Sequence, residues 1–162
     1  MKTQQHNYAL TNVWTGNTGN GTALVRGYER SHTVSIKGKP EQHLTTDNNK
    51  AVGDPSKLKP EDLLVTELSF CHLMSHLYIC ALEGIVVTGY VDQATSIMEE
   101  NINGVGRFKL VILQPTVTVL DSSMIDKAIA LHHHAHELCY IANSVNFEVR
   151  CVPVCKAGNE DI

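Results

Sequence analysis

The chain has 162 residues, of which 43% are hydrophobic and 19% are charged, and its formal net charge at pH 7 is −4. This length suits one hydrophobic core, so we predict a single domain over residues 1–162. The negative charge and the lack of any Lys/Arg cluster argue against nucleic acid or an anionic membrane as a partner.

Location and cysteine usage lead to a second expectation. The N-terminal segment has no apolar run of the kind found in secretory signals, and the apolar stretches look too short and too interrupted to span a bilayer. We therefore expect a soluble, cytoplasmic protein. Thiols stay reduced in that compartment, so the five cysteines are not expected to form a structural disulfide framework, and any disulfide would be transient and catalytic.

The N-terminal third is predicted to be extended. A segment rich in Gly, Thr and Asn at residues 14–22 indicates a hairpin turn, and extended runs follow at residues 23–27 and 33–37. Residues 45–59 are polar and predict a loop that is long enough to be functional or mobile.

A long helix is predicted from Pro60 to about Leu82. Pro60 suits the first helical position, and Gly84 favours a stop just beyond the end. Positions four, seven, fifteen and eighteen residues after Leu64 share one helical face. This apolar stripe contains Cys71 near the middle of the helix.

Strands are predicted over residues 85–98, 108–120 and 146–154. Pro115 within the second of these indicates an edge position or a bulge. The element order β-β-α-β-β-α-β predicts an α+β fold with a mainly antiparallel sheet and two long core helices.

The second helix is expected to start at a cap on Asp121 or Ser122 and to end around Asn143. Cys139 lies at the C-terminal end of its apolar stripe. A cysteine on an apolar face is more often a small core residue than a nucleophile. However, helices pack about 8–10 Å apart, so two inward-facing cysteines on two packed helices are able to meet within disulfide reach.

The histidines raise the alternative of a metal site. His72 and His76 have the i, i+4 spacing that is able to share a metal, but no Glu follows the first of them as in a His-Glu-x-x-His motif. More histidines crowd the second helix, where consecutive ones point in different directions: His132, His133, His134 and His136. We favour solvated or packing histidines over a metal site.

The remaining cysteines carry no clear signal. Cys151 and Cys155 fall on one face of a predicted strand but too far apart for a ligand pair, which favours core or edge positions. Cys80 lies nine residues after Cys71, on the other side of the first helix, and we assign it no role.

Two segments resemble motifs of the OsmC/Ohr family, which is named for osmotically inducible and organic hydroperoxide resistance proteins. Residues 59–64 (KPEDLL), followed by Cys71 ten residues after Glu61, resemble the family's Asn-Pro-Glu-x-Leu…Cys motif. Residues 135–143 (AHELCYIAN) resemble its second motif, around the resolving cysteine. The two cysteines occur in the family's order and on the matching helices.

Three departures place the chain closer to the OsmC-like branch of the family. Lys59 stands where the first motif usually has Asn, Tyr140 stands where the hydroperoxide-resistance branch often has Pro, and His72 follows the first cysteine where an aromatic or apolar residue is more usual. Residues 84–90 and 106–108 also look similar to OsmC-like members.

The resemblance implies an intertwined homodimer with two active sites at the interface. It implies Cys71 as the peroxidatic thiol, Cys139 as the resolving thiol, and an arginine paired with Glu61 beside the thiolate. We choose Arg30 for that arginine, with Arg26 as the second candidate. No bound cofactor or metal is expected, and an external dithiol, by family analogy a lipoyl protein, is expected to restore the enzyme.

The sequence therefore predicts a cysteine-based peroxidase that reduces organic hydroperoxides. One alternative is a non-catalytic or metal-binding stress protein of the same fold that uses the histidines. Another is a domain of this fold with other chemistry, such as thiol-dependent hydrolysis.

Overall fold

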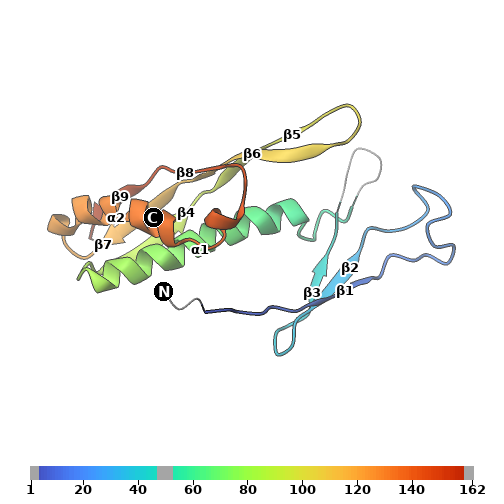
Figure 1. Ribbon diagram of the computed structural model, residues 1–162, viewed down its shortest axis with the longest axis horizontal. Helices are drawn as coiled ribbons and strands as arrows, with labels where there is room; N and C mark the ends of the chain where they lie inside the picture. The colour runs from blue at the N-terminus through green and yellow to red at the C-terminus, as the bar shows by residue number, and fades with distance from the viewer. Residues whose placement is uncertain (1–3, 47–52, 159–162) are drawn as a thin grey trace. The chain divides into compact units, whose positions relative to one another are not determined.

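The computed structural model describes residues 4–46 and 53–158. The N-terminal part of the chain forms a three-stranded antiparallel sheet. Its strands are β1 (Thr11–Trp14), β2 (His32–Ser35) and β3 (Gln42–Leu44), in that spatial order (Figure 1). Strand β2 confirms the strand predicted over residues 33–37, apart from its C-terminal end.

The strand predicted over residues 23–27 is wrong, because this segment forms turns. The amide of Ala23 donates to the carbonyl of Asn20 at 3.3 Å, and the amide of Gly27 donates to the carbonyl of Leu24 at 2.9 Å. These local hydrogen bonds use backbone groups that a sheet ladder would need.

Helix α1 (Pro60–Leu82) has the predicted bounds. Residues 53–59 lead into it through turns, while residues 47–52 of the predicted loop lie outside the described residues. The carboxylate of Asp62 accepts a hydrogen bond from the amide of Lys59 at 3.0 Å at the start of the helix. Gly84 has φ +71°, the left-handed conformation that ends helices.

The buried face of α1 matches the predicted stripe only in part, at Leu68 and Ile79. The buried residues are Leu68, His72, His76, Ile79 and Cys80, whereas Leu82 is 67% exposed. The prediction missed His72 and His76 because a hydrophobicity pattern counts histidine as polar, although a neutral imidazole with a hydrogen-bond partner is readily buried.

Six strands follow α1 and form two three-stranded sheets with the orders β4-β7-β9 and β5-β6-β8. In each sheet the first pair is antiparallel and the second is parallel. The strands are β4 (Val87–Asp92), β5 (Thr95–Glu100), β6 (Gly106–Leu113), β7 (Pro115–Val119), β8 (Glu148–Cys151) and β9 (Val154–Ala157).

The two long strands predicted over residues 85–98 and 108–120 are therefore four shorter ones. Each long run breaks where the chain passes from one sheet to the other, and the amide of Gln114 at one break donates to Oδ1 of Asp92 at 2.7 Å. Pro115 lies at the start of β7, a central strand, and not at an edge or a bulge as predicted. The first residue of a strand tolerates proline's missing N–H.

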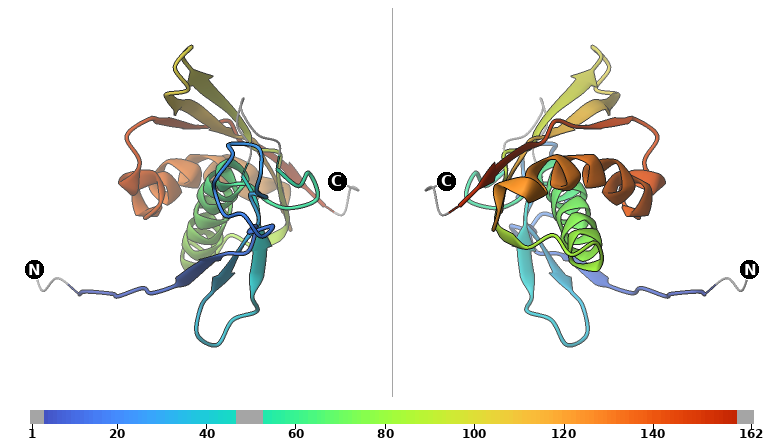
Figure 2. Two further views of the ribbon diagram at one scale, coloured as in Figure 1. Left: turned by 90° about the vertical axis from the view of Figure 1, so that its right-hand side faces the viewer. Right: turned by 90° about the vertical axis from the view of Figure 1, so that its left-hand side faces the viewer.

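Helix α2 (Ile125–Leu138) follows the 3₁₀ turn η1 (Ser122–Met124), whose N-cap Asp121 accepts a hydrogen bond from the amide of Ser123 at 2.8 Å. It ends earlier than predicted, because Cys139 has the extended ψ of 102°. A further 3₁₀ turn, η2 (Ala142–Ser144), occupies the remaining predicted helix. Both views of Figure 2 show α2 crossing α1.

This architecture confirms the predicted α+β class with two helices and mainly antiparallel strand pairing. The chain divides into two compact units, residues 1–63 and 64–162, and the single domain stays a prediction. In the second unit, a core that includes Cys80, Ile85, Val117 and Ala128 joins α1 and α2 to the β4-β7-β9 sheet.

The length and composition of α1 would allow it to cross a membrane, which corrects the expectation that no stretch is long enough. Its buried face nevertheless carries two imidazoles that contact residues of α2. Such contacts are those of a helix in the core of a folded domain. The cytoplasmic location stays a prediction.

Candidate active site

The structure brings Cys71 and Cys139 together. Cys71 is half-buried on α1, and Cys139 is 1% exposed just after the end of α2. The Cys71 thiol is close enough to raise the pKa of the Cys139 thiol, and neither is in a disulfide. The two cysteines that sequence singled out are thus neighbours in space although they lie 68 residues apart in the chain (139 − 71).

The two thiols have different environments. Burial raises the pKa of the Cys139 thiol to about 11, and the neighbouring Cys71 adds to the shift. Hydrogen bonds from the backbone amides of Ala142 and Ile141 to the Cys139 sulfur act in the opposite direction and lower its pKa. Cys139 is therefore a protonated, shielded thiol at neutral pH, while Cys71 is the member of the pair that solvent reaches.

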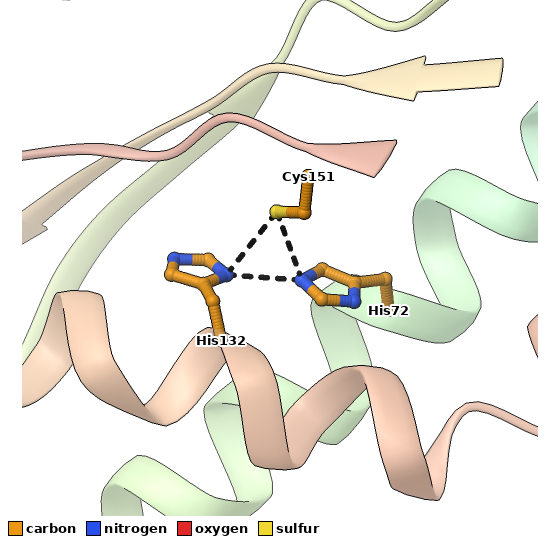
Figure 3. A group of neighbouring side chains, drawn as sticks. All are labelled: His72, His132 and Cys151. Atoms are coloured by element: carbon orange, nitrogen blue, oxygen red, sulfur yellow. Dashed lines mark hydrogen bonds between the residues drawn. The ribbon is translucent and has the colours of Figure 1, made fainter. Parts of the chain in front are cut away.

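A second group of side chains lies one residue further along α1. Nε2 of His72 is 2.9 Å from Nδ1 of His132 on α2, and Sγ of Cys151 on β8 is 3.4 Å and 3.8 Å from these two atoms (Figure 3). The imidazoles are 1% and 4% exposed. We call these three residues the His-Cys cluster.

His76 does not share a site with His72, contrary to the spacing that raised the metal alternative. Its Nε2 donates to the carbonyl of Ala128 at 2.9 Å, and its ring stacks on His132 with centroids 3.7 Å apart. His133, in contrast, is exposed. His76 thus has a packing position and His133 an exposed one.

The chain's family follows from its sequence. A model of the OsmC-like protein family matches residues 53–152, which include Cys71, Cys139 and the whole His-Cys cluster. The chain belongs to the OsmC-like family.

Solved structures agree with this assignment. An OsmC-like protein of unknown function from Vibrio cholerae is 28% identical, with a TM-score of 0.81 over 93% of this chain and 100% of that one. An organic hydroperoxide resistance protein from Elizabethkingia anophelis is 15% identical, with a TM-score of 0.66 over 98% and 100% of the two chains. One from Legionella pneumophila is also 15% identical, with a TM-score of 0.68 over 95% and 99%. The last two show the fold alone. No curated protein matches the chain significantly.

Arg30 and Glu61 belong to the first unit of this OsmC-like chain. Arg30 is half-buried, with its guanidinium carbon 5.0 Å from the centroid of the Tyr28 ring, whereas Arg26 is exposed. Nε of Arg30 and Oε2 of Glu61 are both buried without a hydrogen-bond partner among the described residues. Their pairing with each other and their approach to Cys71 stay predictions.

Burial dominates the electrostatics of the His-Cys cluster. It lowers the pKa of His72 to about 4 and that of His132 to about 3. It also raises the pKa of Cys151 to about 12, and the nearby Asp92 carboxylate raises it further. All three side chains are neutral at pH 7.

Sequence reasoning missed this cluster. It weighed His72 with His76, and it assigned Cys151 to a core or edge position. A signal was present in the spacing, because Leu68, His72, His76 and Cys80 recur every four residues and so form one face of α1. The contribution of Cys151 depends on the parallel pairing of β8 with β6, which no local pattern reveals.

Proposed function

We propose that the protein is a thiol peroxidase that reduces organic hydroperoxides in oxidative stress defence, with Cys71 as the peroxidatic and Cys139 as the resolving cysteine. The observation that carries this proposal is the contact between a half-exposed and a fully buried thiol. Membership of the OsmC-like family and the fold shared with organic hydroperoxide resistance proteins support it.

The first step is attack of the Cys71 thiolate on the O–O bond of the hydroperoxide. The sulfur gains one oxygen as sulfenic acid, and the other oxygen leaves as an alkoxide that takes a proton to become the alcohol. In the second step the Cys139 sulfur attacks the sulfenic sulfur, so that a disulfide forms and water leaves. An external dithiol, by family analogy on a lipoyl protein, reduces the disulfide through exchange.

The environment of Cys139 suits the resolving role. A protonated and shielded thiol reacts poorly with peroxide, because the thiolate is the nucleophile. The amides of Ala142 and Ile141 are able to stabilise charge on its sulfur when the proton leaves. Cys139 is therefore expected to react with the sulfenic acid of Cys71 and not with the peroxide itself.

Arg30 and Glu61 complete the proposed site. A guanidinium beside Cys71 would favour the thiolate and stabilise the departing alkoxide. Glu61 would hold the guanidinium in a two-pronged geometry. The unpartnered buried atoms of Arg30 and Glu61 support this pairing, and Arg26 remains the second candidate.

An apolar row on α1 supports both an organic substrate and the proposed homodimer. Phe70 and Met74, 53% and 59% exposed, lie one and three residues from Cys71 in the chain, and the row continues through Tyr78 and Leu82. Side chains of this kind favour an organic hydroperoxide over hydrogen peroxide. A second copy of the chain would remove the row from water.

Steady-state peroxide consumption with a lipoyl dithiol tests the proposal, with cumene hydroperoxide and hydrogen peroxide as substrates. We expect faster loss of cumene hydroperoxide, and a loss of turnover of at least roughly 10³-fold in Cys71→Ser, on the scale seen when a nucleophile is removed. Unchanged activity in Cys71→Ser would overturn the assignment. Inactivity of the wild type towards both peroxides would instead favour a non-catalytic protein or thiol-dependent hydrolysis.

A further inference from the structure

The His-Cys cluster gathers three metal-ligating atoms from three different elements. His72 comes from α1, His132 from α2 and Cys151 from β8, and their nearest ligating atoms lie within 4.8 Å of one another. Figure 3 shows the thiol and one nitrogen of each ring turned toward a common point.

The spacing of these atoms matches a tetrahedral metal centre. Ordinary Zn–N and Zn–S bonds at a tetrahedral angle separate two nitrogens by about 3.3 Å and a nitrogen from a sulfur by about 3.6 Å. The cluster has 2.9 Å between the nitrogens and 3.4 Å and 3.8 Å between nitrogen and sulfur. A shift of a few tenths of an ångström would therefore produce ligand geometry.

The outer nitrogen of each imidazole, on the side away from the other ring, has no partner among the described residues. Nδ1 of His72 and Nε2 of His132 are buried and accept or donate no hydrogen bond among the described residues. Only one proton lies in the bond between the two imidazoles, so one neutral ring has its own N–H on the unpartnered nitrogen. An ion between Nε2 of His72 and Nδ1 of His132 would leave these outer nitrogens as they are, so the case for a metal rests on the placement of the inner nitrogens and the thiol.

The local charge favours a cation. The carboxylate of Asp92 on β4 is close enough to raise the pKa of Cys151, so it opposes a free thiolate there. A bound divalent ion reverses this relation, because it neutralises the thiolate and is attracted by the carboxylate. Asp92 is itself held by Ser69 and by the amide of Gln114.

We propose that His72 Nε2, His132 Nδ1 and Cys151 Sγ bind one divalent ion of the zinc class, with a fourth position left for water or an external ligand. Two imidazoles and a thiolate are ligands that borderline-soft ions prefer over magnesium or calcium. On binding, the Cys151 thiol releases its proton to solvent. The imidazoles retain their protons on Nδ1 of His72 and Nε2 of His132.

The ion would link α1, α2 and β8, and its ligand His72 directly follows Cys71 in the chain. Its binding requires neither Cys71 nor Cys139, so the site stands apart from the proposed peroxidase chemistry. Cys151 is half-buried and offers a route of entry from the surface. An ion held only by the folded protein also raises the unfolding temperature.

Metal content of the reduced full-length protein, measured after equilibration with Zn²⁺ and removal of loosely held ions, tests the site. We expect one zinc per chain in the wild type and a rise in Tm with zinc. Cys151→Ser and His132→Gln should lose both effects, whereas the matched controls Cys155→Ser and His133→Gln should keep them. Wild type without retained zinc, or Cys151→Ser with a full complement, would overturn the proposal.

Two further measurements keep the test independent of folding and of the redox pair. Co²⁺ bound to the wild type should show a thiolate-to-metal charge-transfer band and the visible bands of a tetrahedral ion, and an octahedral spectrum without the charge-transfer band would contradict the site. The double variant Cys71→Ser/Cys139→Ser should still bind one zinc. Loss of zinc there would place the metal at the redox pair instead.

Discussion

Cys71 and His72 are consecutive residues on α1, yet they belong to two sites with opposite properties. One helical step turns the side chain by about 100°. The half-exposed Cys71 meets the buried sulfur of Cys139, whereas the buried His72 meets His132 and Cys151. Burial raises the pKa of Cys139 to about 11 and that of Cys151 to about 12, so burial does not separate the two sulfurs. The neighbouring groups distinguish them. Cys139 lies beside another sulfur, which suits disulfide chemistry, whereas Cys151 lies beside two imidazoles, which suits a metal.

Replacing Cys139, the proposed resolving thiol, has the largest expected effect on the first site. In Cys139→Ser we expect one turnover, after which excess hydroperoxide oxidises Cys71 to the sulfinic acid, because no neighbouring thiol condenses with the sulfenic acid. Intact-protein mass spectrometry should show the gain of two oxygens. Cys155→Ser is the matched control, and normal cycling of Cys139→Ser with a dithiol would show that Cys139 is not the resolving residue.

The His-Cys cluster is tested most sharply through the free energy of unfolding. His132→Ala removes a buried, stacked and hydrogen-bonded ring, and we expect the free energy of unfolding to fall by about 2–4 kcal/mol. His133→Ala changes the adjacent exposed ring and should cost less than about 0.5 kcal/mol. Denaturant unfolding of the two variants measures the difference, and equal losses would contradict the packing described for α2.

The arginine substitutions separate the two candidates for thiolate activation. We expect Arg30→Lys to lower kcat/KM for the hydroperoxide by about 10-fold or more, because lysine lacks the bidentate fork that a carboxylate holds. Arg26→Lys should leave kcat/KM within about 2-fold, as for a surface substitution. The reverse order would assign the role to Arg26.

The smallest effect is a pH dependence at Cys139. In Cys71→Ser, alkylation of Cys139 should be slow at pH 8 and should rise toward pH 11, because burial, the main cause of its high pKa, remains. The folded-state pKa lies above the unfolded value, so the associated stability is present below about pH 9 and is lost as pH rises through about 11. Peptide mapping after a short pulse of iodoacetamide measures the rate, and fast labelling at pH 8 would contradict a shielded thiol.

The sequence singled out the two cysteines of the proposed redox site, for reasons visible at particular residues. Pro60 and Gly84 mark the two ends of α1, and the spacing from Glu61 to Cys71 and the order of the two cysteines indicated the family. The contact of Cys71 with Cys139 follows from two packed helices, which local patterns do predict.

The His-Cys cluster was beyond such reasoning. Its three residues lie on two helices and on the strand β8, which joins β6 by a parallel pairing that has no local signature. The early end of α2 at Leu138 and the turns at residues 23–27 were missed for a different reason, since local hydrogen bonds close turns there in place of a longer helix and a strand.

Disulfide mapping after one equivalent of cumene hydroperoxide tests the central claim most directly. Fully reduced wild type should lose two hydrogens per chain and yield one cross-linked peptide pair that joins Cys71 to Cys139, with Cys80, Cys151 and Cys155 still alkylated as free thiols. A disulfide that involves Cys151, or five free thiols after the treatment, would contradict the division of the molecule into a redox pair and a separate His-Cys cluster.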